Sequence, residues 1–252
     1  MTTNPVFTLL PDEVHVWHVP LGELVPQMDW RYLLLSQEER ARLTRFHHER
    51  DHNEFCLSRS TLRLLLEAYG VAPAAEIDFA CSARGKPALA TVHDCHWLQF
   101  NLSHTRGMAV YAFAHSRPVG VDIELTRAVP DADRIVASHF AAEEKAEYRM
   151  LPASARQHGF LNAWTRKEAF VKALGEGLNY PLDAFAVSLT PGEPARLVRI
   201  GEKHPEVAKW LLVDLTIDPS YVVALAVLGA PVRLRNRLLR ASREWHEVKD
   251  LD

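Results

Sequence analysis

Hydrophobic and polar positions alternate along several short stretches of the chain, which is the pattern of β-strands. Residues 14–19 read VHVWHV, and the run at 221–230 is almost entirely apolar. Turn-forming residues separate two pairs of these stretches, around Gly107 in one case and at Asp218-Pro219-Ser220 in the other. The pattern predicts strands at residues 14–19, 97–100, 108–113, 119–124, 211–217 and 221–228.

Apolar residues spaced three and four apart predict helices at residues 36–46, 55–69 and 160–174. Ser36, with Glu39 three positions later, forms a capping box that begins the first helix. Gly70 ends the second helix, and Gly175 and Gly177 end the third. We expect loops at residues 73–86 and 128–133.

The later part of the chain repeats the strand–turn–strand pattern of the earlier part. The strands expected from residues 108 and 221 begin 113 positions apart, close to half the chain. We therefore predict an α+β protein of two similar halves related by pseudo-twofold symmetry. The expected divisions are residues 1–117, residues 118–229 and a tail at residues 230–252.

The tail is amphipathic and rich in arginine. Leu234, Leu238 and Trp245 would share one face of a helix, and arginines crowd the rest, among them Arg233, Arg235, Arg237, Arg240 and Arg243. We expect a C-terminal helix that packs on the body with a solvated basic face. A partner-binding site is the alternative.

Composition and charge narrow the class of protein. Hydrophobic residues make up 48% and charged residues 24%, which is typical of a soluble globular protein. The net charge of −3 argues against a general nucleic-acid binder, and the longest apolar run, ten residues, is too short to span a membrane. No secretory signal is evident, and three cysteines fit a reducing compartment. We expect a cytoplasmic protein that binds neither membrane nor nucleic acid.

Two carboxylates lie on the strand expected at residues 119–124. Asp122 and Glu124 would point to one face of it, and Val121 and Ile123 to the other. Adjacent carboxylates repel each other unless a cation or solvent screens them, and Mg²⁺ prefers such oxygen ligands. A metal site is therefore one interpretation. The solvated polar face of a half-buried strand is the other.

A row of three side chains follows on the helix expected at residues 160–174. Trp164, Glu168 and Lys172 lie four residues apart, so Glu168 could join a metal site while Lys172 meets a phosphate. The alternative is a surface ion pair. No two Cys/His doublets are spaced as in a structural zinc site, which argues against that metal.

Polar and basic residues elsewhere could bind an anion. Asn101-Leu-Ser-His104 is expected in a turn, where hydroxyl, imidazole and amide groups form an anion site. A capping turn is the alternative, and a hydrolase triad is disfavoured because no G-x-S-x-G surrounds Ser103. Lys86 follows Gly85 on a tight loop that is no P-loop. Near the end of the first helix, the guanidinium groups of Arg40, Arg42 and Arg45 could donate hydrogen bonds to a phosphate. The alternative is that they form a solvated helix face.

Four segments occur together, in this order: Gly85-Lys86-Pro87, Asn101-Leu-Ser-His104, Gly120-Val-Asp-Ile-Glu124 and Trp164-Thr-Arg-Lys-Glu-Ala-Phe-Val-Lys172. The set resembles the 4′-phosphopantetheinyl transferases of the Sfp type, whose signature is G-[IV]-D-x-E with W-[ST]-x-K-E-[AS]-x-x-K. The resemblance covers nearly all of residues 10–229 and leaves out the tail. Two positions depart from the family: Glu39 stands where some relatives carry a basic residue, and Phe55 where a small polar residue can contact the nucleotide.

The resemblance implies two similar α+β halves with coenzyme A and Mg²⁺ in the cleft between them. Such enzymes move phosphopantetheine from coenzyme A to a serine of an apo acyl or peptidyl carrier protein and release adenosine 3′,5′-bisphosphate. The implied metal ligands are Asp122, Glu124 and Glu168. The implied contacts of coenzyme A are Arg42, Lys86, Ser103, His104 and Lys172. Among these, Lys172 would meet the pyrophosphate, Ser103 and His104 would bind coenzyme A phosphates, and Lys86 would lie by the adenine and its ribose phosphate. We expect a monomer.

Attack on a pyrophosphate depends on positioning and charge stabilisation more than on covalent help from the protein. Lys172 would stabilise the leaving phosphate, and Glu168 or a water bound to the metal would take the proton of the carrier serine. Two other functions fit the same residues: a catalytically silent module that binds coenzyme A, and a metal-dependent phosphodiesterase.

Overall fold

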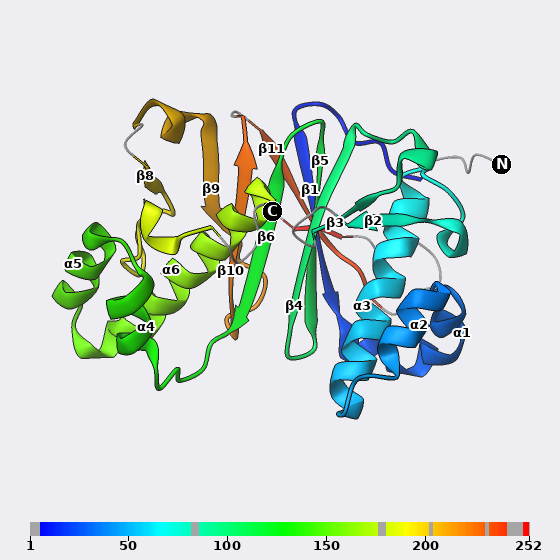
Figure 1. The fold of residues 1–252 in the computed structure, drawn as a ribbon, viewed down its shortest axis with the longest axis horizontal. Coiled ribbons are helices and arrows are strands. Elements are labelled where there is room, and N and C mark those ends of the chain that lie inside the picture. The colour runs from blue at the N-terminus through cyan, green and yellow to red at the C-terminus, as the bar shows by residue number, and fades with distance from the viewer. Residues whose placement is uncertain are drawn as a thin grey trace.

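The computed structural model describes residues 6–81, 86–175, 180–201, 204–229, 232–240 and 249–251. Two halves lie side by side, each with a β-sheet and a long helix (Figure 1). The first half contains β1 (Glu13–Pro20), α1 (Met28–Leu33), α2 (Gln37–Leu43), α3 (Glu49–Ala68), β2 (Phe79–Cys81), β3 (Pro87–Leu89), β4 (Leu98–Thr105) and β5 (Met108–His115). The second contains β6 (Val119–Leu125), α4 (Ala132–His139), α5 (Ala142–Met150), α6 (Ala153–Leu174), β7 (Phe185–Val187), β8 (Leu197–Ile200), β9 (Trp210–Asp214) and β10 (Tyr221–Leu228).

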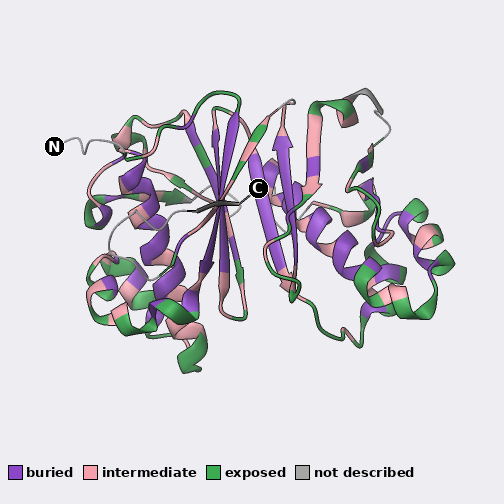
Figure 2. Ribbon diagram, turned by 180° about the vertical axis from the view of Figure 1, so that it is seen from behind, coloured by how far each residue is buried: buried purple, intermediate pink, exposed green. Residues whose placement is uncertain are grey.

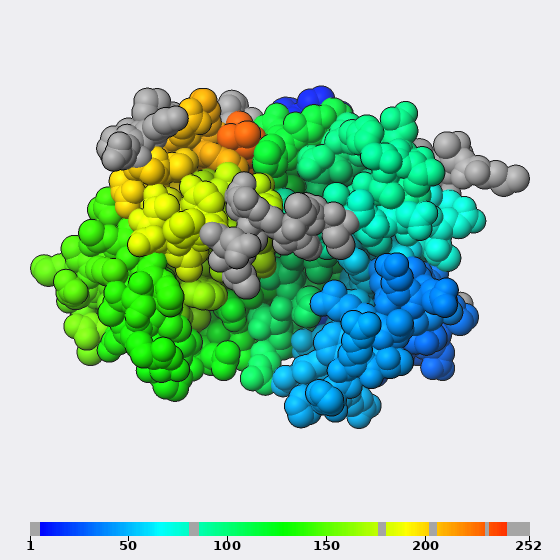
Figure 3. All heavy atoms as spheres, in the orientation of Figure 1, coloured from blue at the N-terminus to red at the C-terminus, as the bar shows by residue number. Residues whose placement is uncertain are grey.

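The two halves share one strand order. In the first, β1 pairs antiparallel with β5, and β5 with β4. In the second, β6 pairs antiparallel with β10, and β10 with β9. This correspondence agrees with the prediction of an α+β fold with two similar halves. The chain crosses between the sheets after β5, and the boundary that we propose, after residue 117, lies in this crossing. Figure 3 shows the halves as adjacent lobes.

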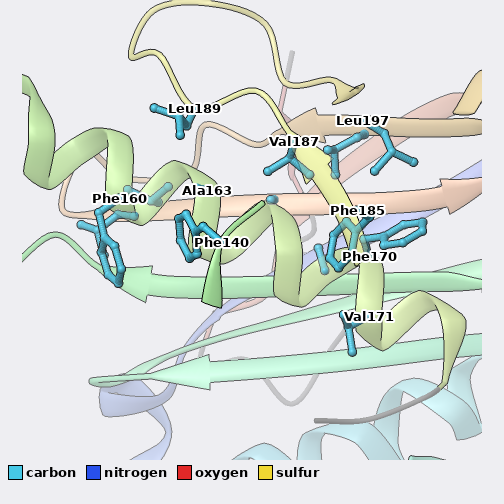
Figure 4. Packing of buried hydrophobic residues seen from close by; sticks show 14 of the residues in the cluster. Phe140, Phe160, Ala163, Phe170, Val171, Phe185, Val187, Leu189 and Leu197 are labelled. Carbon is cyan, nitrogen blue, oxygen red and sulfur yellow. The ribbon is translucent and has the colours of Figure 1, made fainter. Parts of the chain in front are cut away.

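Apolar side chains on both faces of the sheets build four layers: α3, the first sheet, the second sheet and α6. Because side chains alternate along a strand, each central strand contributes to two cores. The core between the sheets contains Val14, Val16, Val110, Ala112, Val121, Ile123, Val223 and Leu225. The outer faces pack on α3 and on α6, and Figure 4 shows part of the α6 core. Burial accordingly concentrates in the central strands (Figure 2). None of the described helices is long and apolar enough to cross a membrane.

Local signals mark the beginning of α2 and the ends of α3 and α6, whereas the beginnings of α3 and α6 lack such signals. The capping box is confirmed: Ser36 Oγ accepts the Glu39 N–H at 3.2 Å, and the Glu39 carboxylate accepts the Ser36 N–H at 2.9 Å. Gly70 and Gly175 end their helices at positive φ of 83° and 73°, whereas Gly177 lies outside the described residues. Both α3 and α6 begin earlier than predicted, at Glu49 and Ala153. No helix was expected at α1, α4 or α5.

The prediction of a helical tail is wrong where the tail is described. Residues 233–238 form strand β11 (Arg233–Leu238), parallel to β1, and β12 (Lys249–Leu251) pairs with β11. The RLRNRL segment also has the two-residue period of a strand, and the open edge of β1 supplies partners for its backbone. The basic face is not simply solvated, because Arg233 pairs with Asp12 and Arg235 with Glu13. Trp245 and Arg243 lie outside the described residues.

Two histidines of β1 are buried among apolar residues. His15 accepts or donates a hydrogen bond to the Tyr69 hydroxyl at 2.7 Å, whereas Nε2 of His18 has no partner among the described residues. Burial lowers the pKa of each imidazole from 6.5 to about 4. Both rings therefore fold in the neutral form, and the unfolded chain binds their protons first as the pH falls.

Acid is therefore expected to destabilise the fold between pH 6.5 and pH 4. Each histidine should lower the free energy of unfolding by about 2 kcal/mol between pH 7 and pH 5, because only the unfolded state is protonated there. Urea unfolding at the two pH values measures the loss. The variant His18→Leu should lose about 2 kcal/mol less than the wild type. An equal loss in both proteins would exclude His18 as a source.

Candidate functional site

The carboxylates of β6 lie on the side of the strand that faces α6. Val121 and Ile123 point into the core between the sheets. Because side chains alternate along a strand, Asp122 and Glu124 point the opposite way, toward the layer that α6 occupies (Figure 1). The D-x-E spacing thus delivers both carboxylates to the helix that carries Glu168.

Close approach of β6 to α6 depends on Gly120. A Cβ atom at this position would lie 2.1 Å from the carbonyl oxygen of Ala169 and 2.3 Å from the backbone nitrogen of Ala173. Only a residue without a side chain allows this contact. The glycine therefore brings the strand within reach of Glu168 and Lys172, one turn apart on α6.

Side chains from three elements meet at Asp122. Lys172 of α6 donates from Nζ to Asp122 Oδ1 at 2.6 Å and to Ser103 Oγ at 3.0 Å. Ser103, on β4 of the other half, donates from its hydroxyl to the same Oδ1 at 2.9 Å. Asp122 is only 5% exposed, whereas the Lys172 side chain is 28% exposed, so water screens the ion pair from the lysine side only. The structure thus brings together three of the predicted residues.

Negative charge exceeds positive charge around this pair. Burial first, and the charge of Asp122 second, raise the pKa of Glu124 and of Glu168. Asp122 Oδ2 and Glu168 Oε1 are buried and have no hydrogen-bond partner within the described residues. Within the described ranges, no three His, Cys, Asp or Glu side chains lie close enough together to hold a metal ion as they stand. The unpartnered oxygens and the crowded charge nevertheless fit a hard cation, which would satisfy both.

A cavity of about 360 Å³ opens beside Lys172. Its cationic lining would attract a polyanion. Arg42 lies over the Phe55 ring at 4.9 Å, and Arg59 is held by the buried carboxylate of Glu39. The lining residues are Arg42, Phe55, Ser58, Arg59, Pro87, Phe100, Asn101, Leu102, Ser103, His104 and Lys172.

His104 lies in the cavity wall next to a carboxylate. Its Nδ1 is 3.7 Å from Glu54 Oε2 on α3, and Glu54 Oε1 accepts the backbone N–H of Gly107 at 3.0 Å. Burial lowers the pKa of His104, and Glu54 partly offsets this. The free protein therefore holds the imidazole largely neutral near pH 7. An anion in the cavity would favour its protonated form.

Lys86 borders a second cavity of about 360 Å³ that adjoins the first at Pro87 and Phe100. Its ammonium donates to the carbonyl oxygens of Val119 at 3.1 Å and of Lys172 at 2.7 Å. Burial lowers its pKa to about 8. Lys86 thus ties the first half to the end of α6. Gly85 lies outside the described residues.

The prediction that Asn101 to His104 form a turn is wrong. These residues lie within β4, and the turn to β5 is made by Arg106 and Gly107, both at positive φ. Two consecutive residues of positive φ suit the right-handed twist of a hairpin. Ser103 contacts Asp122 and Lys172, whereas His104 faces Glu54, so the pair is not arranged as a nucleophile with its base.

Two charged residues, one in the cavity lining and one next to it, were not expected from the sequence. Arg59 follows Phe55 by four residues on α3 and so shares its face, a spacing that could have indicated it. Glu54 meets His104 only through the tertiary fold, and no local pattern marks it. Trp164 lies in the predicted row but stacks on Phe160 in the α6 core instead, with ring centroids 6.0 Å apart.

Comparisons with known proteins match both halves. The sequence model of the 4′-phosphopantetheinyl transferase superfamily matches residues 118–226, and that of the 4′-phosphopantetheinyl transferase N-terminal region matches residues 26–116. The 4′-phosphopantetheinyl transferase HetI of Nostoc sp. is 36% identical over 226 residues, covering 89% of this chain and 92% of that protein. Sfp of Bacillus subtilis, also a 4′-phosphopantetheinyl transferase, is 31% identical over 76% of this chain and 81% of its own. The human L-aminoadipate-semialdehyde dehydrogenase-phosphopantetheinyl transferase is 28% identical, and the match covers 88% of this chain and 77% of that protein.

Proposed function

This chain belongs to the 4′-phosphopantetheinyl transferase superfamily, and from that premise we propose that the carboxylates of β6 and α6, with the cavity beside them, form its catalytic centre. The enzyme transfers 4′-phosphopantetheine from coenzyme A to carrier proteins. The location is supported above all by the buried, unpartnered oxygens of Asp122 and Glu168 next to Lys172, which lines a cationic cavity.

Asp122, Glu124 and Glu168 are the proposed ligands of Mg²⁺. Carboxylate oxygens are the ligands that this ion prefers, and it commonly shares them with substrate phosphates. A bound magnesium ion would offset the negative charge of the pyrophosphate. Three carboxylates lie beside a single positive side chain, Lys172, so a bound metal cation would offset the remaining negative charge.

The chain's own residues carry the remaining steps. The serine Oγ of the carrier bonds to the phosphorus that bears pantetheine, while the bond from this phosphorus to the pyrophosphate bridge oxygen breaks. Glu168 would accept the serine proton through the carboxylate oxygen that does not hold the cation. Lys172 donates from Nζ to the phosphate of the leaving adenosine 3′,5′-bisphosphate, where charge grows.

The cationic cavity is the proposed site of the nucleotide phosphates. Arg42, Arg59 and His104 line it and would contact them, and Lys172 reaches the pyrophosphate end. Lys86 borders the adjoining cavity, where we place the adenine and its ribose. Ser103 also lines the cavity and is a further proposed contact of the coenzyme A phosphates.

The proposed partner is an apo acyl or peptidyl carrier protein. We also propose that the enzyme acts as a monomer in the cytoplasm, and the free thiols of Cys56 and Cys95 suit a reducing compartment. Size-exclusion chromatography with light scattering tests the monomer, for which a mass near 28.5 kDa is expected.

The activity is tested by intact-mass analysis of several apo-carriers incubated with this protein, coenzyme A and Mg²⁺. A carrier heavier by one phosphopantetheine, with one equivalent of adenosine 3′,5′-bisphosphate, is the expected result. Release of the nucleotide without a carrier would indicate a phosphodiesterase. Binding of coenzyme A without any product would indicate a silent binding module.

The His104→Ala variant is expected to lose most of the preference for coenzyme A over dephospho-coenzyme A. A charge-assisted contact with the ribose phosphate corresponds to about ten- to a hundredfold in affinity. Because burial lowers the pKa of the free imidazole, binding should take up a proton and weaken as the pH rises. Calorimetric titration of both ligands measures the two effects. An undiminished preference in the variant would remove His104 from the phosphate site.

A further inference from the structure

We infer that Glu54 is a positioning residue for His104, which leaves Nε2 of the imidazole for the nucleotide phosphates and makes their binding depend on the uptake of a proton. The inference rests on the proposed function, because it concerns how a proposed phosphate contact is held. Glu54 lies on α3, outside the sequence motifs, and is not part of the lining of the cationic cavity.

The Glu54 carboxylate joins two parts of the β4–β5 hairpin. Its Oε1 accepts the backbone N–H of Gly107 at 3.0 Å, in the turn of the hairpin. Its Oε2 lies 3.7 Å from Nδ1 of His104, three residues earlier and near the end of β4. The tip of the hairpin lies beside α3 (Figure 1). One carboxylate therefore holds both the backbone of the turn and the imidazole.

Two further hydrogen bonds fix the turn that Glu54 contacts. The backbone N–H of Leu21 donates to the carbonyl oxygen of Gly107 at 2.7 Å. The hydroxyl of Tyr221, on β10 of the second half, donates to the carbonyl oxygen of Arg106 at 2.9 Å. Because the turn is anchored from both halves, the carboxylate that it holds has a defined position before any ligand arrives.

The two side chains of this contact belong to different cavities. His104 lines the cationic cavity, whereas Glu54 lines a separate cavity of about 540 Å³ between α3 and the hairpin turn. The carboxylate thus approaches the imidazole from outside the cavity proposed for the phosphates. Because it lies at Nδ1, the ring nitrogen left for a ligand in the cationic cavity is Nε2.

The partner of Nδ1 determines what Nε2 can do. A neutral imidazole carries one N–H group, and a carboxylate beside Nδ1 favours the form with the hydrogen there. Nε2 then has a lone pair, which repels a phosphate oxygen and cannot donate to it. A phosphate at Nε2 therefore requires a second proton on the ring, and the resulting imidazolium lies between two anions.

Charged groups on three helices act on His104. Burial, the largest influence, lowers the pKa of His104, and the carboxylate of Glu54 raises it. The positive charges of Lys172 on α6 and of Arg42 on α2 lower it further. The ring is therefore largely neutral in the free protein near pH 7, and it gains its proton from the solvent when a phosphate binds.

The test compares Glu54→Gln with the wild type by calorimetric titration of coenzyme A in buffers of different ionisation enthalpy, which counts the protons taken up. The amide oxygen of the variant can still accept the Gly107 N–H, so its N–H group faces Nδ1 of His104 and favours the hydrogen on Nε2. The neutral ring can then donate to the phosphate, and the uptake expected of the wild type should largely disappear. By linkage, the wild-type affinity should fall by up to about tenfold for each unit of rising pH, and that of the variant by less.

His104→Ala supplies the baseline, because a phosphate monoester itself titrates at about pH 6. The uptake that belongs to His104 is the difference between the wild type and this variant. Glu54→Gln should change the proton count no further in the His104→Ala background. Glu49→Gln removes an exposed carboxylate five residues earlier on α3, and this matched control should take up protons as the wild type does.

NMR titration of the free protein gives a second readout, with the His104 resonance identified by its absence from His104→Ala. Because Glu54 raises the pKa of His104, Glu54→Gln should lower it. Either an unchanged pKa or an undiminished proton uptake in Glu54→Gln would overturn the inference and leave the proposed phosphate site intact. A wild type that takes up no more protons than His104→Ala would instead contradict the proposed placement of a phosphate at His104, whatever Glu54 does.

Discussion

Asp122→Asn is expected to lower the rate of phosphopantetheine transfer by about a thousandfold or more, equivalent to about 4 kcal/mol of barrier. The amide matches the carboxylate in shape but carries no charge, so it is a poor ligand of Mg²⁺ and no ion-pair partner of Lys172. Repulsion with Glu124 and Glu168 is relieved at the same time, so the fold should persist. Initial rates at saturating coenzyme A and carrier measure the loss.

Thermal unfolding provides the control on the fold. The wild type should gain stability from Mg²⁺ with coenzyme A, because ligands of the native state raise the melting temperature. The Asp122→Asn variant should melt cooperatively and lose the gain that depends on Mg²⁺. Asp29→Asn, a neutralised carboxylate on the exposed side of α1, should match the wild type in both assays. Full activity of Asp122→Asn would overturn the metal assignment.

Gly120→Ala is expected to impair both stability and activity. The added Cβ would meet the backbone of α6 at 2.1 and 2.3 Å, and a backbone cannot rotate away as a side chain can. Separation of β6 from α6 should lower the free energy of unfolding by about 3 kcal/mol. It would also move Asp122 from Glu168, and a displacement of about 1 Å can lower a rate about a hundredfold.

Gly22→Ala is the matched control for this change. Its new Cβ would have no atom within 4 Å, so neither stability nor rate should fall comparably. Urea unfolding and single-turnover rates of both variants make the comparison. A Gly120→Ala protein as stable and active as Gly22→Ala would show that the close approach of β6 to α6 is dispensable.

Elements with a local signal were predictable, and elements defined by neighbours were not. Strands β5 and β10 each carry an unbroken apolar run, because both of their faces are buried. Helix α5 buries only Glu144 and Tyr148, so its apolar period is too weak to detect. The sequence pattern of residues 233–238, which form β11, is compatible with a helix as well as with a strand. The open edge of β1, more than 200 residues earlier, decides between them.

The candidate site divides in the same way. Asp122, Glu124, Glu168 and Lys172 were found because a strand and a helix each space their side chains regularly. The sequence does not show that Gly120 allows β6 to contact α6, because this becomes evident only from the position of α6 in the fold. Glu54 and the engagement of Ser103 with Asp122 depend on tertiary contacts over 19 residues or more, which no local pattern encodes.

Strand β11 also affects the order in which the molecule is assembled. When the ribosome has just completed β5, only strands β1, β4 and β5 of the first sheet have been made. Strand β11, which pairs with β1, follows the whole second half in the sequence. The edge of β1 therefore stays exposed while some hundred further residues are synthesised. Chaperones that cover exposed strand edges would act during this interval. The two halves look alike, yet the first cannot be finished before the second has been made.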